Sequence, residues 1–338
     1  ALVSLAGSHV TSMNSRGVVG ISGRVIDQDD VYRALDSAQA VAVPHDREII
    51  HVIQRGFTID GQNGIRKPIG MHGFRMEVEA HIITASATAV ENLRQCVSQA
   101  GIQVSQFVLN PLAAGEMVLS DSERAMGVAV VDLGGGTTNL AIYIDGDVWY
   151  TNVLNVGSSH VTSDIAQGLR LPVEVAEEVK LHHGYAVLEE IPEDESFNIV
   201  SFGSEQSRKV SRRELTDIIE ARVEEIFMLV HKEIKRSGYD GMLPAGLVLT
   251  GGGSLLPGIR KLATRVTGLP ARIGKPEKMV GLTDQISSPA FATSVGLLQW
   301  AILMSESNQL ASEHSGKTKK QLDIKAEKIK SWFGKLLP

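Results

Sequence analysis

The sequence has 338 residues, of which 43% are hydrophobic and 21% are charged, a balance that excludes a disordered chain. Its net charge of −6 excludes an overall electrostatic footprint for nucleic acid, so we expect no nucleic-acid partner. The single cysteine, Cys96, excludes an intrachain disulfide, and no apolar run approaches the ~20 residues that cross a bilayer.

The first third of the chain alternates strand-like runs with helical stretches. Period-two patterns predict strands at residues 1–6, 48–53, 76–83 and 104–109. Helical spacing predicts helices at residues 29–40 and 87–100, and Asp27 or Asp29 is suited to cap the first of them. Because the apolar pattern already begins at Ala1, we expect further residues upstream.

The remainder of the chain reads as strands followed by longer helices. Residues 127–154 hold three predicted strands, and Asp145-Gly146 is suited to the tight turn of a hairpin. Helical patterns follow at residues 161–184, broken near Pro172, and at residues 211–236, where an apolar stripe predicts a core face. A buried strand at residues 246–250, a helix from Pro257 and a helix at residues 292–304 complete the expected order.

The first motif with chemical meaning joins a buried strand to three glycines and two hydroxyls. It runs from Asp132 through Gly134, Gly135, Gly136, Thr137 and Thr138. Glycines allow backbone N–H groups to approach a phosphate, and the threonine hydroxyls can donate hydrogen bonds to it. Asp132 is suited to hold Mg²⁺ through water, because magnesium favours carboxylates and keeps its waters. A plain glycine-rich turn is the alternative.

The second motif repeats the pattern of strand, glycines and hydroxyl. It consists of Gly251, Gly252, Gly253 and Ser254. Glycines at a strand-to-helix junction leave room for a base or sugar, and a helix start favours anions. Glu177 and Lys180, three residues apart on a predicted helix, share one face and are suited to clamp a ribose. An exposed salt bridge is the alternative for this pair.

These motifs together resemble the actin, heat-shock-chaperone and sugar-kinase superfamily. The glycine hairpin is similar to its second phosphate loop, residues 251–254 to its adenosine loop, and the Glu–Lys pair to its base-and-ribose pair. Residues 110–114 and 292–296 resemble its two connecting segments. The resemblance implies an α/β, actin-like (ribonuclease H-like) two-domain ATPase fold that binds ATP and Mg²⁺.

Two departures from the superfamily pattern bear on activity. The first phosphate hairpin is not found in this sequence, so we expect the first domain to be incomplete. Related filament proteins have a glutamate before the connecting proline, where this chain has Asn110. Because an amide is no general base near neutral pH, we name no catalytic residue and expect hydrolysis to be slow or absent.

Within the superfamily, residues 51–53, 161–166 and 281–284 resemble the bacterial cell-division FtsA family. The likeness to this family extends over essentially the whole chain. This resemblance implies the following domains: a small inserted lobe at 1–83; the rest of the first domain at 84–126 with 296–304; a nucleotide-binding lobe at 127–170 and 244–295; an upper, FtsZ-binding-like lobe at 171–243; a flexible linker at 305–318; and an amphipathic helix at 319–338.

The C-terminal pattern predicts a helix that lies on a membrane. Its apolar arc is flanked by lysines, a combination typical of interfacial helices. The lysine within the arc can extend its ammonium toward phosphate. The predicted membrane-binding residues are Leu322, Lys325, Lys328, Ile329, Lys330, Trp332, Phe333, Lys335, Leu336 and Leu337. Packing against the protein's own core is the alternative.

The resemblance implies an adaptor that anchors FtsZ filaments to the cytoplasmic face of the inner membrane at the division septum. Its expected partners are the FtsZ C-terminal tail, further copies of itself in an actin-like filament, anionic lipid and other divisome proteins. Two rivals remain. A sugar-kinase-like phosphotransferase would need a carboxylate base facing a sugar, and an FtsA-like pilus-assembly adaptor would share the cleft without binding an FtsZ tail.

Overall fold

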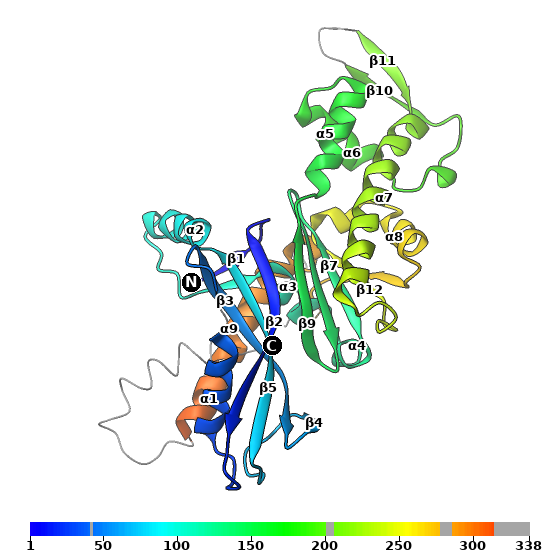
Figure 1. Ribbon diagram of the computed structural model, residues 1–338. Coiled ribbons are helices and arrows are strands. Elements are labelled where there is room, and N and C mark those ends of the chain that lie inside the picture. The colour runs from blue at the N-terminus through cyan, green and yellow to red at the C-terminus, as the bar shows by residue number, and fades with distance from the viewer. Residues whose placement is uncertain (41–42, 201–205, 278–285, 314–338) are drawn as a thin grey trace.

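The computed structural model describes residues 1–40, 43–200, 206–277 and 286–313. It forms an elongated molecule with a small lobe at one end, a mixed sheet in the middle and a helical lobe at the other end (Figure 1). Residues 281–284, which carried part of the family resemblance, and all ten predicted membrane-binding residues lie outside the described residues. Within the described part of the chain, no helix is long and apolar enough to span a bilayer.

The small lobe, residues 7–86, is an antiparallel sheet covered by one helix. Its strand order is β2-β5-β3-β4, and α1 packs on the sheet. Asp27 caps α1 in a reciprocal capping box with Asp30, as the sequence predicts for one of its two candidates. The bounds are β2 Val10–Gly20, α1 Gln28–Gln39, β3 Arg47–Ile59, β4 Gln62–Ile65 and β5 Arg75–Ser86.

A second unit surrounds the two connecting helices. Strand β1 pairs in parallel with β6, and helices α3 and α9 cross beside them. Gly296 of α9 lies so close to α3 that a Cβ atom there would come within 1.9 Å of the Ala113 carbonyl oxygen. The bounds are β1 Leu2–Leu5, α2 Ala87–Gln99, β6 Gln106–Leu109, α3 Asn110–Val118 and α9 Ala292–Glu313.

The central sheet has the strand order β13-β12-β7-β8-β9. Its inner strands are buried on both faces: Ala129 and Val131 of β7 face one core cluster, whereas Val128 and Val130 face another that includes α3 and α9. The bounds are α4 Asp121–Met126, β7 Val128–Leu133, β8 Thr138–Ile144, β9 Asp147–Leu154, β12 Leu247–Thr250, α8 Ile259–Thr267 and β13 Ala271–Ile273, with 3₁₀ turns at Gly252–Leu255 and Pro289–Phe291.

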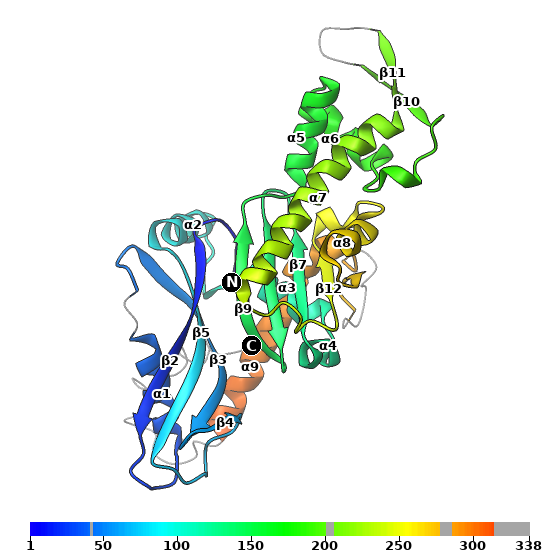
Figure 2. The same cartoon turned by 45° about the vertical axis from the view of Figure 1, so that its right-hand side comes forward.

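The small lobe covers the outer edge of the central sheet. The Ser12 hydroxyl donates to the Thr151 carbonyl at 2.8 Å, and the His81 ring lies 3.0 Å from the Thr151 hydroxyl. Beside them the Arg55 guanidinium stacks 3.8 Å from the Trp149 ring centroid. Figure 2 shows β2, β3 and β5 beside β9 at this edge. Burial is the main cause that lowers the pKa of His81 to about 3, so the ring is neutral in this interface.

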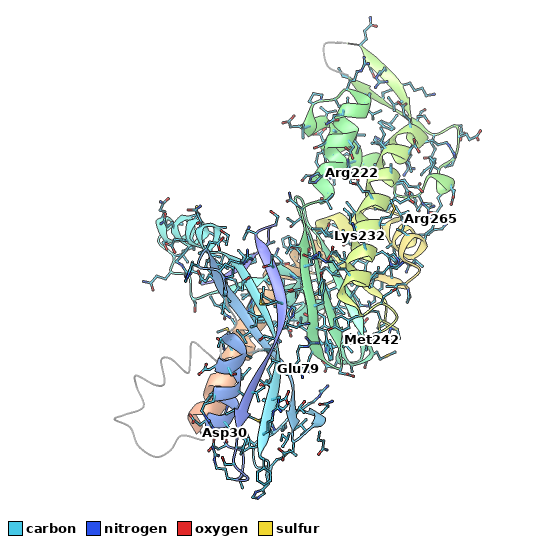
Figure 3. All side chains as sticks on the ribbon, viewed as in Figure 1. Asp30, Glu79, Arg222, Lys232, Met242 and Arg265 are labelled. Carbon is cyan, nitrogen blue, oxygen red and sulfur yellow. The ribbon has the colours of Figure 1, made fainter. Side chains whose placement is uncertain are left out.

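The upper lobe, residues 158–237, stands on the opposite end of the central sheet. The predicted apolar stripe of its long helix α7 is buried, as expected for a core face. Arg222 of α7 forms an ion pair with Asp164 of α5, and Arg265 of α8 forms one with Glu220 of α7. Figure 3 shows where Arg222 and Arg265 lie. The bounds are α5 Ser158–Leu169, α6 Val173–His183, a 3₁₀ turn at Leu188–Glu190, β10 Ser196–Val200, β11 Ser207–Ser211 and α7 Arg212–Ser237.

Three predicted boundaries differ from the structure. The upper lobe is predicted to begin at residue 171, but it includes α5 from Ser158. Residues 1–6 were assigned to the small lobe, but β1 pairs with β6 and not with the four-stranded sheet. Residues 305–318 were predicted to be a flexible linker, but α9 continues to Glu313. The polar sequence from residue 305 to Glu313 contains no glycine or proline, so nothing local stops the helix within that stretch. Residues 314–318 of the predicted linker lie outside the described residues.

Candidate functional site

The two glycine motifs lie side by side at the end of the central sheet. Strands β7 and β12 are parallel neighbours, with Thr250 opposite Asp132 in the register. A Cβ atom at Gly251 would lie 2.4 Å from an Asp132 carboxylate oxygen, and Gly251 has a φ of +80°. Only glycine accepts both the backbone conformation and the close approach. The carboxyl ends of these strands therefore form one continuous glycine-lined rim.

The hairpin between β7 and β8 is fastened to the start of α5. The Gly134 N–H donates to the Thr137 carbonyl at 2.9 Å, which closes the turn. The N–H groups of Ser158 and Ser159 donate to the carbonyls of Gly134 and Gly135, each at 2.9 Å. Gly135 and Gly136 remain exposed at the tip. The hairpin thus exposes backbone that no side chain covers, and the hydrogen bonds from α5 fix its position.

Asp132 is buried at the base of this rim. Asn139 donates to its carboxylate at 3.1 Å, and Thr293 and Asn110 donate as well, from the starts of α9 and α3. Burial raises the pKa of Asp132 to about 6, although these hydrogen bonds act in the opposite direction. The carboxylate is therefore the point at which the central sheet meets both connecting helices.

Glu177 and Lys180 form an ion pair that belongs to a larger polar cluster. Lys180 Nζ lies 2.7 Å from a Glu177 carboxylate oxygen and 2.8 Å from the Thr162 hydroxyl, which donates to the same carboxylate. Burial alone would raise the pKa of Glu177, but the hydrogen bonds from Lys180 and Thr162 and the lysine charge outweigh it and lower that pKa. The cluster is thus an ion pair at neutral pH, with α5 contributing to it.

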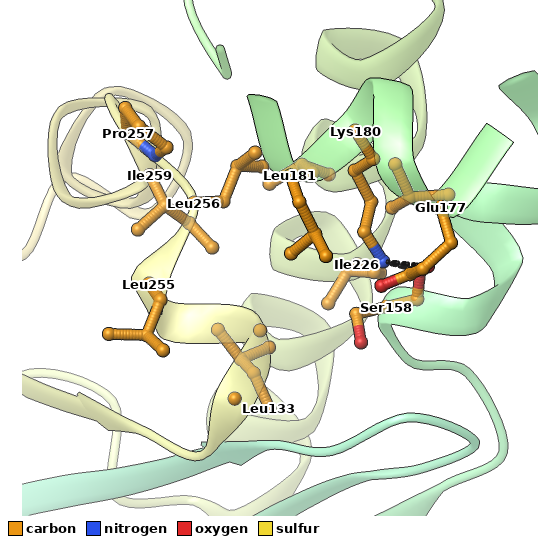
Figure 4. A pocket seen from close by; sticks show the side chains of 14 residues that line it. Leu133, Ser158, Glu177, Lys180, Leu181, Ile226, Leu255, Leu256, Pro257 and Ile259 are labelled. Carbon is orange, nitrogen blue, oxygen red and sulfur yellow. Dashed lines mark hydrogen bonds and ion pairs between the residues drawn. The ribbon is translucent and has the colours of Figure 1, made fainter. Parts of the chain in front are cut away.

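A cavity of about 330 Å³ opens between this cluster and the second glycine motif. That volume is within the range of small-molecule sites. Figure 4 shows Glu177, Lys180 and Ser158 on one side of it and Leu255, Leu256, Pro257 and Ile259 on the other. The lining residues are Leu133, Ser158, Val161, Glu177, Lys180, Leu181, Val223, Ile226, Gly252, Gly253, Leu255, Leu256, Pro257 and Ile259.

Comparison with known proteins identifies the family. A family model described as cell division protein FtsA matches residues 129–296, and a model of the SHS2 domain inserted in FtsA matches residues 7–84. The chain is 38% identical to the cell division protein FtsA of Pseudomonas aeruginosa over 98% of its own length and 80% of that protein. The chain belongs to the FtsA family.

Solved structures place this FtsA-family chain in the actin-like fold. The PilM–PilN type IV pilus biogenesis complex has a TM-score of 0.60 at 18% identity, covering 88% of this chain and 77% of the solved one. MreB5 of Spiroplasma citri bound to ADP has a TM-score of 0.56 at 21% identity, covering 67% of this chain and 68% of the solved one. The predicted actin-like fold is therefore confirmed, as is the predicted family.

The structure separates the predicted site residues of the FtsA-family chain into two groups. Glu177, Lys180, Gly252 and Gly253 line the cavity, and Gly134 to Thr137 form the hairpin next to it. The hydroxyls of Thr138 and Ser254 are hydrogen-bonded within the protein. Both side chains are buried, and they donate to the carbonyls of Val156 and Gly251 at 2.7 Å each, because each closes its own loop.

Sequence reasoning missed two polar residues of the site, Ser158 and Thr162. Ser158 lines the cavity, and its carbonyl accepts from Lys180 at 3.4 Å. The Thr162 hydroxyl is hydrogen-bonded to both members of the ion pair, Glu177 and Lys180. Ser158 and Thr162 share one face of α5, but Ser158 precedes the helical pattern predicted at residues 161–184, so no sequence signal linked the two. Within the part of the chain that the structure describes, no cluster of three or more potential metal ligands occurs.

The burial of Asp132 predicts a stability that depends on pH. Its folded pKa of about 6 lies above the ordinary 3.8, so the ionised carboxylate destabilises the folded state, fully above about pH 6 and not at all below about pH 4. Asp132→Asn should therefore raise the free energy of unfolding of nucleotide-free protein by on the order of 2 kcal/mol at pH 7.5. The buried, unpaired Asn110 Oδ1 offers the new amide an acceptor after a flip of Asn110.

Urea denaturation of wild type and Asp132→Asn at pH 7.5 and pH 4, without magnesium, measures this difference. We expect the gain at pH 7.5 to disappear at pH 4. An equal change of stability at both pH values would show that the Asp132 charge carries no penalty.

Proposed function

We propose that this chain is an ATP-binding cell-division adaptor. The observation that carries the proposal is the cavity that joins the Glu177–Lys180 pair to the bare backbone of Gly252 and Gly253. A Cβ atom at Gly253 would lie 3.0 Å from the Leu133 side chain, so the narrow wall at this place depends on glycine. Apolar walls with a few convergent polar groups are the usual form of a nucleoside site.

The parts of ATP find matching groups in this site. The ribose hydroxyls are suited to Glu177 and Lys180, the base to the apolar walls, and the phosphates to the exposed backbone of Gly135 and Gly136. Asp132 lies at the base of the same rim, where a carboxylate can hold Mg²⁺ through water. The solved MreB5 structure, bound to ADP, supports nucleotide binding in this fold.

Membership of a cell-division family supports the adaptor part of the proposal. We propose that the upper lobe binds the C-terminal tail of FtsZ and that the small lobe takes part in filament contacts between copies. Residues 319–338, outside the described residues, would anchor the assembly to anionic lipid on the cytoplasmic face of the inner membrane, where it recruits other divisome proteins at the septum. Several subunits in one filament would add their membrane affinities. We assign no catalytic residue, because Asn110 is no general base.

Nucleotide binding is tested by Lys180→Ala. The substitution removes the cation of the cluster, and the remaining Glu177 is half-exposed, so we expect the fold to be retained. ATP affinity in the presence of Mg²⁺ should fall roughly tenfold in isothermal titration calorimetry, as for the loss of one charge-assisted contact. The control is Glu178→Ala on the same helix, because Glu178 is exposed and does not line the cavity. Unchanged affinity for Lys180→Ala would refute this placement of the nucleotide.

Membrane anchoring is tested separately by sedimentation with liposomes that contain anionic lipid. The protein should sediment with the liposomes, and the protein without residues 322–338 should not. Equal sedimentation of both would remove the membrane part of the proposal while leaving the nucleotide site untouched.

A further inference from the structure

The polar side chains of the cavity are confined to one end. Ser158, Glu177 and Lys180 are the only polar side chains among the lining residues, all of which belong to the described part of the chain. Figure 4 shows them together, opposite Leu255 and Pro257. The rest of the wall consists of aliphatic side chains, a proline and two glycines. A ligand therefore meets polar side chains with one portion and apolar surface with the other.

The backbone of the apolar wall is largely occupied by its own turns. The N–H groups of Ser254, Leu256 and Ile259 donate to the carbonyls of residues 251, 253 and 256, at 3.1, 3.3 and 3.2 Å. Pro257 has no N–H, and its carbonyl accepts from Ala186 at 2.9 Å. Groups of this kind are what a protein uses to read the edge of a base. Along this wall several of them, including the N–H groups of Leu256 and Ile259, already have a partner within the protein.

Two leucines at the cavity are exposed although they are apolar. Leu181 of α6 is 70% exposed and Leu255 of the glycine loop is 55% exposed, and they come from opposite walls. A flat apolar surface placed between them would cover both. A purine ring has that shape, whereas a pyrimidine covers less of it.

We propose that the cavity selects a nucleotide by its ribose and by the size of a purine, and distinguishes adenine from guanine only weakly. The inference rests on the proposed nucleotide site. A site built to hydrogen-bond a particular group can reject an analogue by 10⁴-fold or more, whereas an apolar pocket discriminates by about 10- to 200-fold. Adenine and guanine have the same ring system, and the larger number of polar groups on guanine gives ATP a modest advantage.

Calorimetric titration of the full chain with unlabelled nucleotides and Mg²⁺ tests this proposal. We expect the Kd for GTP to lie within about tenfold of the Kd for ATP. CTP should bind more weakly than either purine, and 2′,3′-dideoxy-ATP should bind at least tenfold more weakly than ATP. A GTP affinity more than 100-fold below that for ATP would overturn the inference, as would equal binding of ATP and dideoxy-ATP.

The Lys180→Ala variant separates the ribose from the base. Its ratio of dideoxy-ATP to ATP affinity should move toward one, while its ratio of GTP to ATP affinity should stay as in wild type. Glu178→Ala should leave both ratios unchanged. Selective binding of ATP alone would leave the proposed function standing and overturn the inference, whereas binding of no nucleotide by the wild type would overturn both.

Discussion

Gly296→Ala should destabilise the protein by about 3 kcal/mol, because the new methyl group would collide with backbone. Its Cβ atom would lie 1.9 Å from the Ala113 carbonyl oxygen and 2.4 Å from the Ala113 carbonyl carbon. No side-chain rotation relieves such a contact, so α3 and α9 must move apart. The better helix propensity of alanine, worth up to about 1 kcal/mol, offsets only part of the cost.

Urea denaturation followed by circular dichroism measures this effect. Gly20→Ala is a suitable control, since no atom lies within 4 Å of the added Cβ and the residue has no positive φ. The control should change stability by less than about 0.5 kcal/mol. If Gly296→Ala were as stable as Gly20→Ala, the close crossing of α3 and α9 would be wrong.

A second pair of substitutions distinguishes neighbouring glycines of one loop. Gly251→Ala should cost about 2–4 kcal/mol, from a left-handed backbone conformation and a collision with the Asp132 carboxylate and the Leu133 carbonyl. Gly252→Ala should cost less than about 0.5 kcal/mol, because the nearest atom is 4.0 Å away and its φ is not positive.

Thermal unfolding of both variants in nucleotide-free buffer tests the pair. Only Gly251→Ala should lower the midpoint clearly, and it should also weaken ATP binding, because it displaces the two glycine motifs from one another. Equal midpoints for the two variants would show that the register between β7 and β12 does not bring Gly251 against Asp132.

Several parts of this architecture could be predicted from local sequence because their causes are local. The glycine motifs, the reciprocal cap of α1 and the apolar stripe of α7 depend on residues a few positions apart. The direction of a hydroxyl depends instead on packing. Thr138 and Ser254 have the right residue type for phosphate contacts, yet each is buried and bonded within its own loop.

Pairing between distant segments was the other limit. Residues 1–6 show the alternation of a strand, but alternation does not identify the partner, and β1 joins β6 about a hundred positions later. The contacts of Thr162 could not be predicted for the same reason. It reaches Glu177 only because α5 and α6 pack together, so the sequence showed a pair where the structure has a cluster.

The contact between the small lobe and β9 also bears on how copies of the protein can meet. An uncovered outer strand offers unpaired N–H and C=O groups to any other extended chain and invites uncontrolled aggregation. Here the Ser12 hydroxyl donates a hydrogen bond to the Thr151 carbonyl, and the Arg55 guanidinium stacks on the Trp149 ring. A neighbouring molecule therefore cannot extend the central sheet along β9, and strand pairing between copies at this edge is excluded.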